Sequence, residues 1–446
     1  MRIRILLGLF IFCCGILSAQ EKKWTLEECV YYAVENNLTI EQFELDLENA
    51  KIDRSDAIGD MLPNFNANAS LSGNSGLVLD QSRNQQVSGT VTTASGGFGS
   101  SVSLFDGLRN VHRLNRAKLN ALANQYRLDD LKDDIMLAVA NAYLQVLSSK
   151  ESLKVFRAQY AVTEQDLART KELVNAGVVP KGDLLEIEAT AANQEQQIVN
   201  GENQVLISRI GLAQLLQIRD YENFDIADEE FDVPPSNILD NSPKTIFDKA
   251  LTYRNDIKFS MSNVELAQKD LQIAKGAVYP TLGAFFNYGT RYSSEFRDPV
   301  TFNRIAFTDQ LYLTDGISYG LQLNVPVFNG FSVRNNIKRA KIGVERSRLQ
   351  LEQDKLDLET NINQAYVDVK NFSKAYEAAQ KTLEARRLAY NYSKERFDVG
   401  LMNAFDFSQS QSRVDNAEAE LIRTKYDYIF RLKVLEFYFG LPITLD

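Results

Sequence analysis

The sequence predicts an α+β fold in which long helical hairpins and a few strands occur twice in the same order. The first observation is an internal repeat: Phe105 returns as Phe328 and Tyr143 as Tyr366, each about 223 residues later. The second is that apolar residues recur with helical periodicity through two long stretches that contain no proline. The third is that four shorter segments alternate polar and apolar residues, which is the period of a strand.

The first 19 residues are expected to be a secretory signal peptide. Arg2 and Arg4 precede an apolar run at 5–17, and small residues follow it. This run is shorter than the ~20 apolar residues of a membrane-spanning helix. We therefore expect an exported protein in which Cys29 is the one remaining cysteine, so that no internal disulfide can form.

The first repeat is assigned to residues 20–218. Thr25 and Glu28 form a capping box at the start of a helix that Pro63 follows. The alternating segment after Pro63 is a strand, and the stretch from Gly73 to Gly97, rich in Gly, Ser and Asn, is expected to be a long loop. The expected elements are a helix at ~25–60, strands at 64–72 and 98–106, a helix at ~108–175 and a return helix from Asp183 to about Gln217.

The second repeat is assigned to residues 243–440, after a linker at 219–242 that contains Pro234 and Pro235; residues 441–446 form a tail. Its proline and its Phe-Asn-Gly corner lie about six residues farther apart than in the first copy, and we place the difference in a loop. The expected elements are a helix at ~243–279, strands at 281–288 and 317–327, a loop at 291–316, a helix at ~331–398 and a return helix to about Phe439.

The predicted strands determine how this chain could cross a membrane. After the signal peptide, no segment approaches the ~20 apolar residues of a spanning helix, so a membrane protein with this sequence must cross as strands of ~9–11 residues. Two strands per copy are too few to close a sheet, and free edges are not viable in lipid. Four strands per chain therefore imply that several chains share one β-barrel.

Charge and residue content exclude several functions. The formal net charge of −10 disfavours nucleic acid as a partner, because phosphate binding needs a basic face. His112 is the sole histidine, which argues against a Ser/His/Asp triad and against a histidine-based metal site. We therefore expect no enzyme activity, no metal and no cofactor.

The order of elements resembles the TolC-type outer-membrane efflux protein family over essentially all of the mature sequence. The resemblance is carried by the duplicated order, by the Phe-Asp-Gly and Phe-Asn-Gly corners at Phe105 and Phe328, and by the two hairpin turns. It implies a homotrimer with a 12-stranded transmembrane β-barrel among outer-membrane lipid and an α-barrel of hairpins in the periplasm. It further implies a passive exit duct of a tripartite efflux or type I secretion system, whose partners are a periplasmic adaptor protein and an inner-membrane pump.

The same resemblance assigns roles to the hairpin turns. In the family, a Val-Gly-Leu turn meets the adaptor, and this chain matches it fully in the second hairpin and more loosely in the first. Glycine also suits a helix C-cap, so that Gly177 and Gly400 have a purely structural alternative. The predicted docking residues are Ala176, Gly177 and Val178 in the first turn and Val399, Gly400 and Leu401 in the second.

Two aspartates follow the turns at the positions that line the closed periplasmic entrance in the family, Asp183 and Asp406. Three chains would bring six carboxylates into one constriction, where they would attract cations. The alternative is an N-cap at each return helix. The chain departs from the family at Gln409, where a second aspartate is expected, and at Met402, where a basic residue is expected.

A periplasmic coiled-coil scaffold or adaptor without a pore is the alternative function. Adaptors usually have one helical hairpin flanked by β-rich domains, whereas this chain has two hairpins with strands at corresponding places. Detergent dependence and conductance would distinguish the two.

Overall fold

The computed structural model describes residues 23–80, 85–228 and 231–442. The expected signal peptide at 1–19 lies outside the described residues. The fold is α+β and divides into two compact units. Among the described residues, those within 23–44, 127–257 and 353–442 form the helical unit, and those within 45–126 and 258–352 form the sheet unit.

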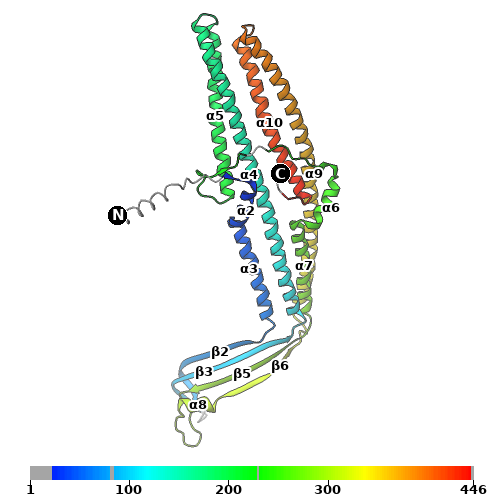
Figure 1. The fold of residues 1–446 in the computed structure, drawn as a ribbon. Helices are drawn as coiled ribbons and strands as arrows, with labels where there is room; N and C mark the ends of the chain where they lie inside the picture. The colour runs from blue at the N-terminus through cyan, green and yellow to red at the C-terminus, as the bar shows by residue number, and fades with distance from the viewer. Residues whose placement is uncertain (1–22, 81–84, 229–230, 443–446) are drawn as a thin grey trace, which may run out of the picture. The chain divides into compact units, whose positions relative to one another are not determined.

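Two helical hairpins dominate the helical unit. Figure 1 shows the return helix α5 beside α4, and α10 beside α9. Each length occurs twice, with 67 residues in α4 and α9 and 35 in α5 and α10. The predicted long helices and their return helices are therefore confirmed to within a few residues. Their bounds are Arg109–Asn175 for α4, Lys181–Leu215 for α5, Ser332–Asp398 for α9 and Ala404–Tyr438 for α10.

The two helices predicted at ~25–60 and ~243–279 are each broken in two, so these predictions are wrong in their continuity. The first breaks at Asn37 and the second at Arg254, where ψ is 121° and 130°. The side-chain oxygen of Asn37 accepts from the backbone N–H of Thr39 at 2.9 Å, which begins the next helix. The resulting helices are α2 (Leu26–Asn36), α3 (Leu38–Gly59), α6 (Pro243–Tyr253) and α7 (Asn255–Gly276).

The break at Arg254 is held by a buried cation. Its side chain is 8% exposed, and Nη2 lies 3.0 Å from Asp256 Oδ2 and 3.4 Å from Asp130 Oδ1. The guanidinium also lies over the rings of Phe437 and Tyr438, at 5.5 and 5.6 Å from their centroids. A buried charge needs such partners. Asp130, Phe437 and Tyr438 lie far from Arg254 in the sequence, which explains why helical periodicity did not reveal the break.

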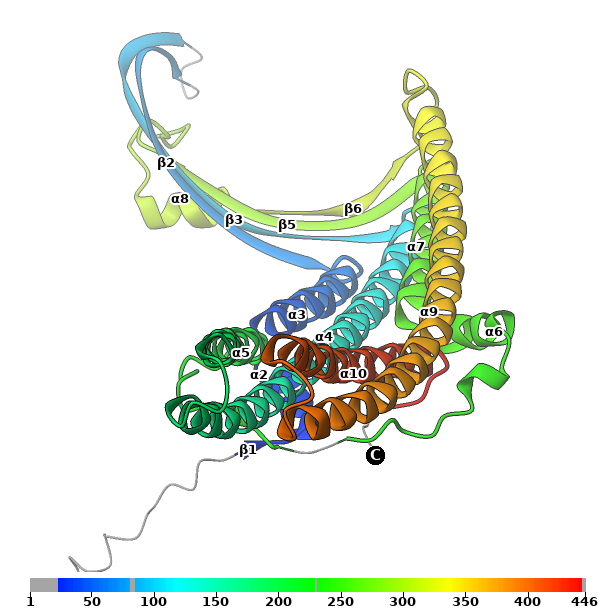
Figure 2. The same cartoon turned by 90° about the horizontal axis from the view of Figure 1, so that it is seen from above.

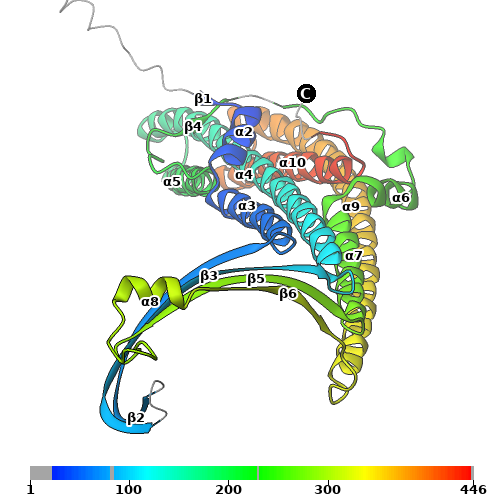
Figure 3. The ribbon, with the colours of Figure 1, turned by 90° about the horizontal axis from the view of Figure 1, so that it is seen from below.

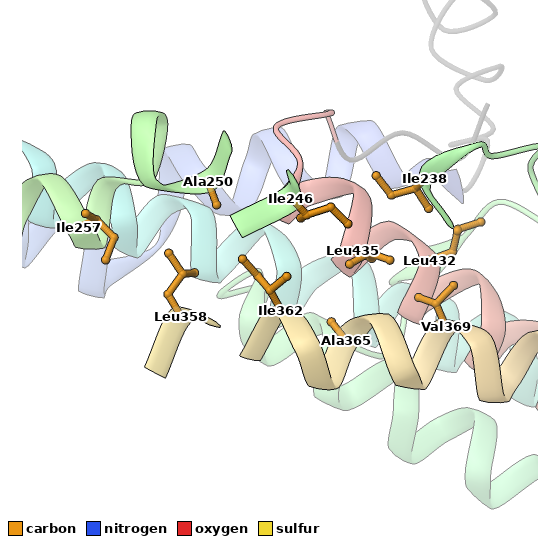
Figure 4. Close-up of a cluster of buried hydrophobic side chains, with 10 residues drawn as sticks. All are labelled: Ile238, Ile246, Ala250, Ile257, Leu358, Ile362, Ala365, Val369, Leu432 and Leu435. Carbon is orange, nitrogen blue, oxygen red and sulfur yellow. The ribbon is translucent and has the colours of Figure 1, made fainter. Parts of the chain in front are cut away.

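An apolar cluster packs α6, α9 and α10 together in the helical unit (Figure 4). Ile246, Ile362 and Leu435 are fully buried in it. Burial of one such side chain contributes about 1.5–3 kcal/mol. The cluster consists of Ile238, Ile246, Ala250, Ile257, Leu358, Ile362, Ala365, Val369, Leu432 and Leu435.

The segment at 219–242 is structured as well. It contains strand β4 (Asp225–Ile226), which pairs in parallel with β1 (Lys23–Trp24), and the 3₁₀ helix η1 (Ile238–Asp240). Ile226 is fully buried, and Ile238 belongs to the apolar cluster. Part of the predicted linker is therefore packed against the helical unit.

The sheet unit contains one antiparallel sheet in the order β2-β3-β5-β6, which Figure 2 shows as a single curved layer. The prediction of a long loop from Gly73 to Gly97 is wrong. Strands β2 and β3 remain paired from Asn64↔Ser101 to Asp80↔Gln85. The strands are β2 (Asn64–Asp80), β3 (Gln85–Phe105), β5 (Thr281–Ser293) and β6 (Gly316–Asn324).

Small polar residues make this long pairing between β2 and β3 workable. Hydroxyl groups form hydrogen bonds across the two strands. The Oγ atoms of Ser70 and Ser95 are 2.8 Å apart, and Ser72 Oγ is 2.7 Å from Thr93 Oγ1. Gly, Ser and Asn are common in loops, but the continuous backbone ladder with the partner strand decides the conformation here.

The predicted loop at 291–316 contains a short helix, α8 (Phe307–Leu313). Gln310 is buried and ties α8 to the sheet, because its Oε1 accepts from the N–H of Ser293 at 2.9 Å. Its Nε2 donates to the carbonyl oxygen of Ile305 at 2.8 Å. The loop is therefore an ordered element that packs against β5.

Polar side chains link helices of the two hairpins within the helical unit. Gln194 Nε2 donates to Asp415 Oδ2 at 3.0 Å, and Gln411 Nε2 donates to Thr163 Oγ1 at 2.7 Å. Burial raises the pKa of the Asp415 carboxyl to about 6, against the hydrogen bond from Gln194 that lowers it. The carboxyl therefore favours its protonated form more in the folded chain than in the unfolded one, where its pKa is about 3.9.

This pKa predicts how Asp415 affects stability. As pH rises from about 4 to above 6, the unfolded carboxyl ionises first, so the contribution of Asp415 to stability falls. Asp415→Asn keeps an oxygen for Gln194 but cannot ionise. We expect it to stabilise the protein at pH 7.5 and to change little at pH 4.5, as measured by helix unfolding in circular dichroism. Glu164→Gln, at an exposed position of α4, is the control, and an equal gain at both pH values would contradict this account.

Candidate functional site

The two hairpin turns are built on the same backbone motif. Gly177 and Gly400 have φ of +73° and +77°, a conformation that favours glycine. An added Cβ at either would meet no atom within 4 Å, so the backbone angle is what requires glycine. The next N–H in each turn donates to a carbonyl five residues earlier, from Val178 to Leu173 at 2.9 Å and from Leu401 to Arg396 at 2.8 Å. The structural alternative for both glycines, a helix C-cap, is thus confirmed.

Apolar side chains project from these turns into solvent in the single chain. Val178 is 66% exposed, Val399 70% and Leu401 71%. All six predicted docking residues are exposed: Ala176, Gly177, Val178, Val399, Gly400 and Leu401. Exposed apolar side chains on both turns are the kind of surface that another protein covers.

The structure brings the two turns together at one groove of about 800 Å³. Val178 and Asp183 line it from the first hairpin, and Gly400, Leu401 and Met402 line it from the second. Asp406 is not among its lining residues. The sequence identified both turns separately, and the structure shows that they share a surface.

An ion pair between the hairpins borders this groove, and sequence reasoning missed it. Arg169 Nη1 lies 2.5 Å from Asp398 Oδ1, and Nη2 donates to the carbonyl oxygen of Asp398 at 3.4 Å. The residues about 223 positions away from these two are Tyr392 and Asn175. The pair therefore joins positions that are not equivalent in the two repeats, and comparison of the repeats carries no signal for it.

Asp183 and Asp406 are each the third residue of a return helix. The N-caps are Pro180 and Asn403, so the N-cap alternative for both aspartates is wrong. Asn403 Oδ1 accepts from the N–H of Asp406 at 2.8 Å, and its Nδ2 donates to Asp406 Oδ2 at 2.9 Å. A negative charge in the first turn suits the helix dipole. Asp406 is exposed and Asp183 is half-buried.

The second turn is supported by stacked aromatic rings. Phe397 and Phe407 stack at 4.5 Å with an interplanar angle of 3°, and Tyr390 lies 5.7 Å from Phe407 on centroids. Gln409, one of the two departures from the family pattern, accepts from Arg413 Nη2 at 3.1 Å through its Oε1. Met402, the other departure, is half-buried in the groove.

The sheet has two chemically different faces. The described side chains of one face are mostly apolar and include no charged group, and the remaining ones are small or carry hydroxyls. The apolar and aromatic residues of this face are Phe65, Ala67, Ala69, Leu71, Ala94, Phe98, Val102, Leu282, Ala284, Phe286, Tyr288, Tyr292, Ile317, Tyr319, Leu321 and Leu323. The other face is mostly polar. Its polar residues are Asn64, Asn66, Asn68, Ser70, Ser72, Thr93, Ser95, Ser101, Asn287, Arg291, Ser318, Gln322 and Asn324. Both faces follow from the strict alternation of strand residues.

The apolar face is the convex one. Tyr292 on this face lies 5.0 Å from the ring of Phe307 in α8, and Figures 2 and 3 show α8 on the convex side of the curved sheet. The polar face is therefore concave. A hollow of about 550 Å³ lies on it, lined by residues that include Asn66, Asn287 and Arg291.

Glycines let larger side chains lie along the concave wall. A Cβ on Gly320 would come within 3.1 Å of the Phe285 ring, and one on Gly99 within 2.6 Å of Asn287 Oδ1. Phe285 and Asn287 thus extend over neighbouring strands.

The described part of the chain lacks two features, an apolar membrane-spanning helix and a cluster of metal-binding side chains. None of its helices combines the length and the apolar character that a crossing of the membrane requires. Within the same residues, no group of three or more His, Cys, Asp or Glu side chains is arranged to hold a metal ion.

Comparison with known proteins decides the family. The family described as outer membrane efflux protein matches residues 30–216 and 246–441, which is most of the chain. The chain belongs to the outer membrane efflux protein family. Membership places it in the outer membrane, in agreement with the resemblance seen in the sequence.

The chain shares about a fifth of its aligned residues with two curated relatives. It is 22% identical to the proteases secretion protein PrtF of Dickeya chrysanthemi over 68% of this chain and 63% of the relative. It is also 22% identical to the outer membrane protein TolC of Vibrio cholerae, over 68% of this chain and 66% of the relative. These matches span just under two thirds of each relative.

A solved structure supports the fold. The crystal structure of the Campylobacter jejuni CmeC outer membrane channel has a TM-score of 0.80 and 17% sequence identity, with 93% of this chain and 85% of that chain covered. At this identity the likeness concerns the fold.

The turn geometry predicts the effect of substitutions at Gly400. Gly400→Ala forces an L side chain into a left-handed conformation at a cost of about 1–2 kcal/mol, whereas Gly400→Asn costs less because Asn tolerates this conformation. We expect Gly400→Ala to lower the unfolding free energy of the helical part more than Gly400→Asn does, as measured by denaturant titration. The control is Gly182→Ala, at a glycine within helix α5. Equal losses for Ala and Asn at position 400 would contradict the backbone argument.

Proposed function

We propose that this chain is the outer-membrane exit duct of a tripartite efflux or type I secretion system. The two-faced sheet is the observation that carries the proposal: its convex side offers apolar residues to lipid, and its concave side offers polar residues to water. A duct of this kind needs no catalytic residue, because the energy for transport comes from the pump. A role in secretion at the outer membrane agrees with the similarity to the proteases secretion protein PrtF and to the outer membrane protein TolC.

Three chains would form the duct. The sheet has two edges, β2 and β6, whose outward backbone groups need partners in lipid. Pairing β2 of one chain with β6 of the next closes a barrel of 12 strands when three chains assemble. Helices α4 and α9 are equally long, as are α5 and α10, which supports an internal duplication. Each chain therefore has two similar hairpins, and three chains would supply six to a periplasmic α-barrel.

The hairpin turns would dock a periplasmic adaptor, which links the duct to an inner-membrane pump. The exposed apolar residues Val178, Val399 and Leu401 support this role, as does the groove that both turns share. The two turns are unequal, because Ala176-Gly177-Val178 and Val399-Gly400-Leu401 differ in size. An adaptor would therefore meet two unequal sites in each chain.

Conductance separates this function from a periplasmic scaffold without a pore. We expect the detergent-purified protein to produce discrete single-channel steps in a planar lipid bilayer, because the proposed barrel encloses water. A scaffold would stay in solution without detergent and leave the bilayer current unchanged. That outcome would overturn the proposal.

The entrance aspartates give a second prediction. Three copies of Asp183 and Asp406 would place six carboxylates at one constriction and bind multivalent cations there. In the double variant Asp183→Asn with Asp406→Asn, we expect the cation concentration for half-maximal block to rise about tenfold, which corresponds to ~1.4 kcal/mol. Asp220→Asn, in the loop after α5, is the control. An unchanged block in the double variant would remove the entrance role from both residues.

A further inference from the structure

We infer that Arg291 sets the charge selectivity of the sheet part of the duct and favours anionic solutes there. The inference rests on the proposed function, because it requires the concave face to border water. Among the side chains that the structure describes on this face of β2, β3, β5 and β6, Arg291 is the one that carries a charge. The neighbouring positions are amides, hydroxyls and glycines.

The position of Arg291 follows from the strand register. Arg291 lies opposite Ser95, and Ser95 lies opposite Ser70, so the guanidinium belongs to a row of hydroxyl residues. Its side chain is exposed, and it lines the concave hollow together with Asn66 and Asn68. It therefore faces the space that the proposed duct leaves open.

Along β5 the polar face is neutral up to this point. Thr281, Gly283, Phe285, Asn287 and Gly289 precede Arg291 at alternate positions. Ten residues of strand span about 33 Å. Over this length no described side chain of the wall supplies a competing charge, so a single ring of arginines dominates the local field.

The nearest carboxylate along the chain is already paired. Glu295 lies 3.2 Å from Arg297 Nη2 through Oε2 and 2.9 Å from Arg304 Nη2 through Oε1. Its negative charge is thus compensated by two loop arginines. Arg291 keeps a net effect on solutes in the concave space.

Three chains would place three Arg291 side chains around one lumen. Such a ring of like charges repels cations and concentrates anions, as rings of charged side chains do in selective pores. Exposed charges act over about 10 Å at 0.1 M salt and about 3 Å at 1 M. The effect is therefore moderate and depends on salt. Asp183 and Asp406 have the opposite sign but belong to the helical unit, so the two charge rings can be tested separately.

The test is the reversal potential of single channels in a KCl gradient. In Arg291→Gln we expect the cation-to-anion permeability ratio to rise about twofold near 0.1 M salt and to change less near 1 M. Arg291→Lys keeps the charge and should retain the wild-type ratio. Asn68→Gln changes the same face without a change in charge and is the matched control. Ser95→Asp places a carboxylate opposite Arg291 and should raise the ratio by an independent route.

The outcomes separate the inference from the proposed function. If wild type and Arg291→Gln both conduct with the same permeability ratio, the inference is overturned and the duct stands. If Arg291→Gln does not insert, the Ser95→Asp ratio decides, and no rise in that variant overturns the inference. If the wild type itself gives no channels, the proposed function fails.

Discussion

Backbone hydrogen bonding in the four-stranded sheet is the constraint on which the other features depend. Strands β3 and β5 have partners on both sides, while β2 and β6 form the edges. In lipid, an unpaired backbone N–H or C=O costs several kcal/mol, so these edges need other strands. The same pairing fixes the alternation of side chains and thereby makes one face apolar and the other polar. The proposed assembly, the proposed lipid contact and the proposed water-filled interior all depend on this one ladder of hydrogen bonds.

The helical hairpins meet a different requirement, because each long helix must end in a turn that leaves apolar side chains exposed. Gly177 and Gly400 satisfy the last carbonyl groups within the turn, so the adjacent valine and leucine side chains are left to project outward. Farther from the turns, amide and carboxyl side chains such as Gln194 and Asp415 bond across helices. Such directional contacts specify the register of the helices more strictly than apolar contacts alone.

The sequence predicted local structure well and long-range pairing poorly. Helix α4 was found to within a few residues because its period is unbroken and Gly177 ends it. The Gly, Ser and Asn residues of segment 73–97 predict a loop, but they are common in small-residue strands as well. Only pairing with the partner strand distinguishes the two. The breaks at Asn37 and Arg254 carry no proline or glycine, and the pair of Arg169 with Asp398 joins segments 229 residues apart. The family resemblance predicts the docking role of the turns and the entrance role of Asp183 and Asp406, whereas the groove that both turns line is visible only in the structure.

Assembly through the sheet edges is the central claim, and the native mass of the purified protein in detergent measures it most directly. The 446-residue chain has a mass of 50.4 kDa, and removal of the expected signal peptide would lower this value. Native mass spectrometry is expected to give one species of three chains that separates into single chains only when the sheet unfolds. A complex of one or two chains from native membranes would contradict the account, because four or eight strands would leave the proposed 12-stranded barrel incomplete.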